Sequence, residues 1–89
     1  MKELFDLLAS TTDMINVEIH AGGFTSSLNT YIISTEKYTD GLKVYIENES
    51  DFFISSVVDE IIEEVSDDMF YTYYIQTALK AIIILKIPR

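Results

Sequence analysis

Carboxylates are the residues of this sequence whose types and spacing come closest to a chemical site. Two pairs of adjacent acids, Asp59-Glu60 and Glu63-Glu64, are four residues apart, and the only histidine is His20. Paired carboxylates act as general acid and base only in a cleft that separates their pKa values, and 89 residues leave little room for one. The calcium-loop spacing is absent, and no nucleophile motif surrounds His20. We therefore expect no enzyme, no metal site and no cofactor.

The composition sets limits on the class of protein. The chain contains no cysteine, which excludes disulfides, thiolate metal sites and cysteine nucleophiles. Its N-terminus lacks the form of a secretory signal, and its longest apolar run, residues 81–85, is too short to cross a membrane. We expect a single compact domain over residues 1–89, a monomer that is located in the cytoplasm.

The acids are concentrated in one quarter of the sequence. The chain has 15 acidic and six basic residues, which gives a net charge of −9. Nine of the acids lie between Glu47 and Asp68, and no base occurs between Lys43 and Lys80. Such a surface repels nucleic acid and argues against direct binding, but it attracts proteins with a basic nucleic-acid-binding groove. The alternative is a solvated acidic face that aids only solubility.

The acidic segment has the periodicity of a helix. Apolar residues recur every three or four positions from Ile54 to Val65, and Ser50 is a suitable N-cap. A second helix is expected to begin at Ser66, followed by two acids in its first turn. The tail, residues 78–87, either prolongs this helix or contributes a strand to the sheet edge.

The N-terminal half has the pattern of a helix followed by three strands. We expect a short helix at Lys2–Ala9 and strands at 15–19, 28–34 and 42–46, joined by a glycine loop and by the turn Asp40-Gly41. The predicted fold class is α+β, with a short N-terminal helix, a three-stranded antiparallel sheet and two C-terminal helices. An extra C-terminal edge strand is the alternative for the tail.

Several short motifs occur in the order found in a known family. They are Val17-Glu18-Ile19, Leu28–Ile33, Asp40-Gly41, Glu47-Asn48-Glu49-Ser50, Phe70-Tyr71, Gln76-Thr77 and Leu79-Lys80. In this order the chain resembles the small acidic type II-A anti-CRISPR proteins of phages, and in particular the DNA-mimicking inhibitor of the RNA-guided CRISPR nuclease. The resemblance implies inhibition in a bacterial host cell by occupying the site where the nuclease reads its short DNA motif (PAM).

The resemblance also implies which residues contact the partner. Asp67 and Asp68 match acids before the Phe-Tyr pair, and Asp40 and Gly41 match a contacting turn. Gly22, Gly23 and Phe24 match a loop that reaches toward a nuclease active site. Independently of the resemblance, the helix pattern places Glu60, Glu63 and Glu64 on one exposed acidic surface with Asp67.

Two other functions are consistent with the same residues. One is an acidic inhibitor of a different nucleic-acid enzyme, such as a restriction enzyme, a glycosylase or a toxin nuclease. The other is a structural or oligomerisation module that pairs through the apolar tail, Ala78–Ile87.

Overall fold

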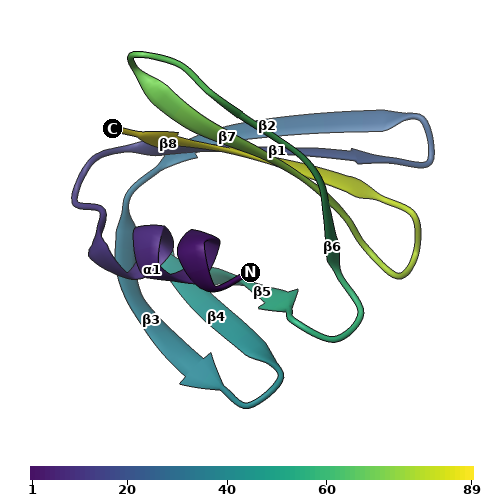
Figure 1. The fold of residues 1–89 in the computed structure, drawn as a ribbon, viewed down its shortest axis with the longest axis horizontal. Coiled ribbons are helices and arrows are strands. Elements are labelled where there is room, and N and C mark those ends of the chain that lie inside the picture. Colours follow the sequence, from purple (N-terminus) through teal and green to yellow (C-terminus); the bar gives the residue numbers. More distant parts are fainter.

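A computed structural model describes all residues, 1–89, as two antiparallel β-sheets with one helix between them (Figure 1). The elements in chain order are α1 (Lys2–Ser10), β1 (Ile15–Ala21), β2 (Phe24–Thr30), β3 (Ile32–Tyr38), β4 (Gly41–Ile46), β5 (Ser50–Ser55), β6 (Glu60–Ser66), β7 (Phe70–Gln76) and β8 (Ile82–Pro88). The larger sheet has the order β2-β1-β8-β7-β6, and the smaller sheet has the order β3-β4-β5.

The predicted α+β fold with two C-terminal helices is wrong. The N-terminal helix is confirmed, but both segments expected to be C-terminal helices are strands: β5 and β6 cover the acidic segment, and β7 begins at Phe70. The tail does form a strand, yet β8 is the central strand of the larger sheet and pairs with both β1 and β7. It is therefore not an edge strand.

The acidic segment forms strands because its apolar positions also suit a sheet. Most of them are Ile and Val, which are β-branched and favour strands. A helix would also bring acids that are four residues apart in the sequence next to each other, which is unfavourable. Ser55 ends β5, and its Oγ accepts hydrogen bonds of 3.1 Å from the backbone N–H groups of Val57 and Val58. This serine-centred turn interrupts the apparent helical stripe in its middle.

The predicted second strand, 28–34, is divided between the two sheets. Thr30 ends β2 and pairs with Ile15 in the larger sheet, whereas Ile32 begins β3 and pairs with Ile46 in the smaller sheet. Tyr31 lies at the crossing, where its backbone N–H donates to Glu47 Oε1 at 3.3 Å. A segment whose residues all suit one strand thus contains a change of sheet.

The predicted glycine loop, 21–27, is reduced to two residues. Gly22 and Gly23 have φ values of +55° and +85°, and Ala21 already pairs with Phe24. Two consecutive residues with positive φ form the tight hairpin turn that matches strand twist. The hairpin therefore continues through most of the segment expected to be a loop.

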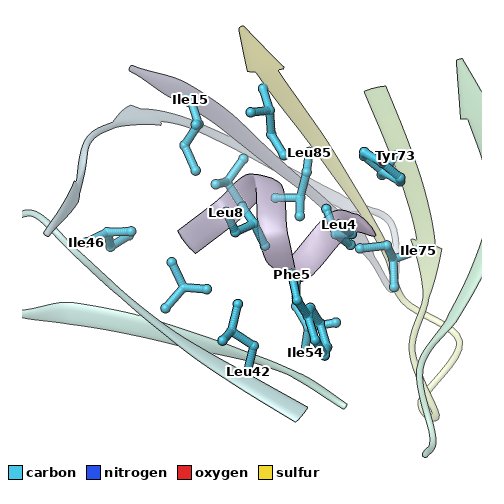
Figure 2. Packing of buried hydrophobic residues seen from close by; sticks show 13 residues of the cluster. Leu4, Phe5, Leu8, Ile15, Leu42, Ile46, Ile54, Tyr73, Ile75 and Leu85 are labelled. Atoms are coloured by element: carbon cyan, nitrogen blue, oxygen red, sulfur yellow. The ribbon is translucent and has the colours of Figure 1, made fainter. Parts of the chain in front are cut away.

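The core lies between the two sheets and around one side of α1. Figure 2 shows Leu4, Phe5 and Leu8 of the helix directed into a cluster of side chains from both sheets. This cluster contains 13 buried apolar residues, among them Ile54, Ile75 and Leu85 at 0% exposure. Burial of each large apolar side chain stabilises the fold by about 1.5–3 kcal/mol. The helix thus fills the space that two small sheets alone would leave open.

Candidate functional site

The acids of β6 lie along an edge of the larger sheet. β6 is the outermost strand of this sheet and pairs only with β7 (Figure 1). Its sequence, EIIEEVS, is exposed at every position except the half-buried Ile61. The unpaired edge of β6 therefore presents backbone groups to solvent, and its exposed carboxylates lie beside this edge.

A strand distributes the three glutamates differently from a helix. Glu60 pairs with Gln76 and Glu63 pairs with Tyr74, so both side chains lie on the outer face of the sheet. Glu64 pairs with Tyr73, which belongs to the core, so Glu64 lies on the face toward α1. The register shifts between Ile61 and Glu63, which makes Ile62 a bulge residue. The predicted single acidic face is thus divided between two faces.

Glu64 contributes to a second acidic surface, which the sequence did not indicate. A hollow of about 320 Å³ lies between α1 and the β6–β7 pair, lined by Glu3, Asp6 and Glu64 together with Tyr71 and Tyr73. Burial raises the pKa of Tyr73 to about 12, and the Glu64 carboxylate beside it contributes to this rise. Acids far apart in the sequence are thereby brought around one hollow.

The two aspartates after β6 differ in their availability. Asp67 Oδ1 accepts hydrogen bonds of 2.8 Å from the backbone N–H groups of both Met69 and Phe70, and these bonds lower the pKa of its carboxyl group. Asp67 therefore holds the β6–β7 turn. Asp68 is exposed and makes no hydrogen bond within the chain, so only Asp68 is fully available to a partner.

The carboxylates are not neutralised by the protein's own bases. The only basic side chain within 4.0 Å of a carboxylate oxygen is His20, whose Nε2 lies 2.9 Å from Glu18 Oε1, and no Lys or Arg nitrogen lies within this distance of a carboxylate oxygen. Arg89, near the acidic turn, donates to the backbone carbonyl of Asp67 at 2.9 Å and lies 4.6 Å from the centre of the Tyr71 ring. The negative charge of the β6 edge is therefore directed to solvent.

The predicted turn Asp40-Gly41 lies near the beginning of β6, but its glycine has a structural role. A Cβ atom on Gly41 would come closer than 3.0 Å to the carbonyl oxygen of Ile54. Asp40 lines a hollow together with Asp59, the residue that immediately precedes β6. The backbone carbonyl of Asp40 accepts a hydrogen bond of 2.8 Å from Ser56 N. Asp40 therefore joins the acidic edge, whereas buried Gly41 serves strand packing.

The predicted loop contact does not join this surface. Gly22, Gly23 and Phe24 lie at the turn from β1 to β2, and β2 is the edge of the sheet opposite to β6. Phe24 is exposed there, at 81% of its surface. A partner bound along β6 alone would not reach it, because three strands lie between the two edges.

A chain of polar side chains on the β1–β2 hairpin was missed. Thr25 Oγ1 lies 3.2 Å from His20 Nδ1, and His20 Nε2 lies 2.9 Å from Glu18 Oε1. The order hydroxyl, imidazole, carboxylate is that of a hydrolytic triad, and the i, i+2 spacing of Glu18 and His20 was the available signal. These groups lie on an open sheet face with 42% of the His20 side chain exposed, which gives a substrate no cleft. The absence of enzyme activity stays a prediction.

Comparisons with protein-family models, curated proteins and solved structures find no match to this chain. The helix of the structure is not long or apolar enough to span a membrane. No group of three or more His, Asp or Glu side chains is arranged to hold a metal ion.

Proposed function

We propose that this protein binds the basic nucleic-acid-binding surface of another protein and blocks it as a DNA mimic. The observation that carries the proposal is the edge strand β6, whose carboxylates are exposed and have no base of the same chain within 4.0 Å. A fold that used these acids for its own stability would pair them with its six bases.

The spacing of the acids is compatible with this role. β6 carries three carboxylates, at Glu60, Glu63 and Glu64, and a strand rises about 3.3 Å per residue, so they extend over roughly 13 Å, with Glu60 and Glu63 on one face. Duplex DNA presents about one charge per 1.7 Å of axis. The strand is therefore sparser in charge than DNA, but each carboxylate can accept two hydrogen bonds from an arginine.

The family resemblance supplies the first target to test, an RNA-guided type II CRISPR nuclease at its PAM-binding site, in the bacterial cytoplasm. The fold does not contribute to this choice, because the segments expected to form two C-terminal helices are strands here. Support for a DNA mimic therefore comes from charge and exposure, and restriction enzymes, glycosylases and toxin nucleases remain targets for the same assay.

An oligomerisation module that pairs through the tail is less well supported. Leu85 and Ile87 of β8 are fully buried, and β8 has strand partners on both sides. Pairing of two copies through β6 would bring Glu60 and Glu63 close to like charges, which is unfavourable. We therefore keep the monomer as part of the proposal.

The direct test is a binding and cleavage assay with a panel of type II nucleases loaded with guide RNA. We expect inhibition that a DNA oligonucleotide carrying the recognition motif relieves and that salt weakens. The test variant combines Glu60→Gln, Glu63→Gln and Asp68→Asn, which remove charge but retain side-chain size. It should weaken binding by roughly tenfold or more.

The control variant removes the same charge from other elements. It combines Asp13→Asn, Glu47→Gln and Glu49→Gln, three exposed acids outside β6 and its flanking turns. Because charges separated by more than about 8 Å are screened at physiological salt, this variant should bind nearly as the wild type does. Equal losses in both variants would show that only net charge matters, and no loss in either would reject the acidic edge.

A further inference from the structure

A hollow beside the acidic edge is bordered by exposed apolar side chains that do not belong to the buried core. It has a volume of about 630 Å³ and lies between the β5–β6 loop and the β7–β8 turn. Figure 1 shows these two connections at the same end of the molecule. Its lining includes Phe53, Val57, Val58 and Leu79, whose exposures are 41%, 73%, 57% and 92%.

The loop on one side of the hollow is held by hydrogen bonds. Ser55 Oγ accepts from two backbone N–H groups of the loop, and Ser55 N donates to Asp59 Oδ2 at 2.8 Å. Ser56 N donates to the carbonyl of Asp40 at 2.8 Å, which ties the loop to the β3–β4 turn. The exposed valines are therefore presented by an ordered loop.

The turn on the other side is also hydrogen-bonded. Lys80 N donates to the carbonyl of Thr77 at 2.9 Å, and Ala81 N donates to Thr77 Oγ1 at 3.2 Å. These bonds place Leu79 at the tip of the turn, beside the hollow. A preformed apolar surface of this kind can bind a partner without the cost of ordering a loop.

The charges around the hollow indicate the chemistry of its occupant. Asp40 and Asp59 both line it, and Asp59 is followed directly by Glu60 of β6. The hollow is therefore continuous with the acidic edge. A partner whose apolar side chain enters the hollow would need Lys or Arg residues beside that side chain to match these acids. Basic grooves that bind single-stranded nucleic acid combine these two features, because aromatic side chains among their Lys and Arg residues stack on bases.

We propose that this hollow binds an aromatic side chain of the basic partner, one that would otherwise stack on a nucleic-acid base. The inference rests on the proposed function and adds an apolar anchor to it. The carboxylates of β6 then take the place of phosphates, and the hollow formed by Val57, Val58 and Leu79 takes the place of the neighbouring bases.

The test uses two synthetic peptides, Lys-Lys-Trp-Lys-Lys and Lys-Lys-Ala-Lys-Lys. The protein contains no tryptophan, so the fluorescence of the first peptide reports only the environment of its own indole. We expect this peptide to bind roughly tenfold more tightly than the alanine peptide, because an aromatic side chain leaves water, and its emission should shift to shorter wavelength.

Two variants assign the binding to the hollow. Val57→Ser with Leu79→Ser should abolish both the preference for the tryptophan peptide and the emission shift, and should leave the alanine peptide unaffected. Neither side chain belongs to the core, so the fold should persist. Ile33→Ser with Met14→Ser, two exposed apolar side chains away from the hollow, should leave the preference intact.

The outcomes distinguish the anchor from the acidic edge. Equal binding of both peptides to the wild type, lost when Glu60 and Glu63 become glutamine, would overturn the anchor and leave the proposed function standing. A preference that survives in the Val57 and Leu79 variant would also overturn it. No binding of either peptide, and no binding to any nuclease of the panel, would overturn both proposals.

Discussion

The carboxylate of Asp67 is committed to its own turn, and its ionisation should stabilise the fold. Its pKa is lowered from 3.8, first because it accepts hydrogen bonds from the backbone of Met69 and Phe70. A group with a lowered pKa in the folded state contributes stability above its unfolded pKa, and that contribution is lost as pH falls through the folded value. We therefore predict that Asp67→Asn lowers the melting temperature at neutral pH. The difference in melting temperature between this variant and the wild type should become smaller in acid.

The neighbouring acid provides the control for this prediction. Asp67→Asn replaces a charged acceptor of two hydrogen bonds by a neutral one, whereas Asp68→Asn changes the net charge by the same amount and weakens no hydrogen bond, because the Asp68 side chain makes none within the chain. It should leave the melting temperature unchanged or slightly higher. Thermal unfolding followed by circular dichroism measures both variants, and equal effects of Asp67→Asn and Asp68→Asn would contradict the assigned role.

At the scale of single residues, sequence patterns found exposed acids but could not separate free ones from engaged ones. Asp67 and Asp68 are adjacent and chemically alike, and only the turn geometry shows that one of them accepts two backbone hydrogen bonds. Asp59 is engaged in the same way by Ser55 N. Whether an acid is free or accepts such hydrogen bonds depends on the backbone conformation of its turn, which the residue types alone do not reveal.

At the scale of elements, the β3–β4 hairpin depends on close approach at Gly41. Any Cβ there would meet the carbonyl oxygen of Ile54 and the ring of Phe53, at distances that real contacts do not show. We predict that Gly41→Ala destabilises the protein by about 1–3 kcal/mol, as expected for overpacking in a buried site. Chemical denaturation monitored by circular dichroism measures this value.

A glycine in an open position provides the comparison. Nothing lies within 4 Å of a Cβ atom built on Gly22, whose φ is +55°, and asparagine tolerates this left-handed conformation. Gly22→Asn should therefore cost less than Gly41→Ala. If Gly41→Ala proved neutral for stability but reduced partner binding, Gly41 would be a contact residue, as the family resemblance implied.

Element types were predictable where one period dominated. The helix at the N-terminus and the strands beginning at Ile15 and ending at Ile46 follow clear patterns, and the structure contains them. The acidic segment failed because Ile and Val spaced by three and four residues fit both a helix and two strands separated by a turn. The structure resolves this ambiguity by pairing β6 with β7 in a hairpin, in which Ile61 and Glu64 lie opposite the buried Ile75 and Tyr73.

The candidate site was predictable as a stretch of charge but not as a shape. Glu60, Glu63 and Asp68 were named from the sequence and are exposed together on and beside β6. The hollow beside Val57 was not predicted, because a helix pattern assigns that side chain to the core. The separation of Phe24 from β6 likewise follows from strand order, which is a property of the whole sheet.

At the scale of the whole molecule, the net charge of −9 opposes the compact state. If the acids of β6 serve a partner, reversing one of them should stabilise the protein while it weakens binding. Glu63→Lys is the sharpest choice, because Glu63 is exposed and Lys is well tolerated on edge strands. We predict that Glu63→Lys raises the free energy of unfolding by about 0.2–0.5 kcal/mol. Added salt should stabilise this variant less than it stabilises the wild type, and the variant should inhibit the basic partner less strongly.

The two readouts of Glu63→Lys separate the alternatives for the acidic edge. An acid kept only for solubility would be replaced by Lys with no loss of binding to any basic protein, since both charges blunt an exposed edge. An acid that stabilises the sheet would give a lower melting temperature on reversal. Only an acid that contacts a basic partner combines higher stability with weaker binding, so thermal unfolding and inhibition measured on the same preparation decide between the three roles.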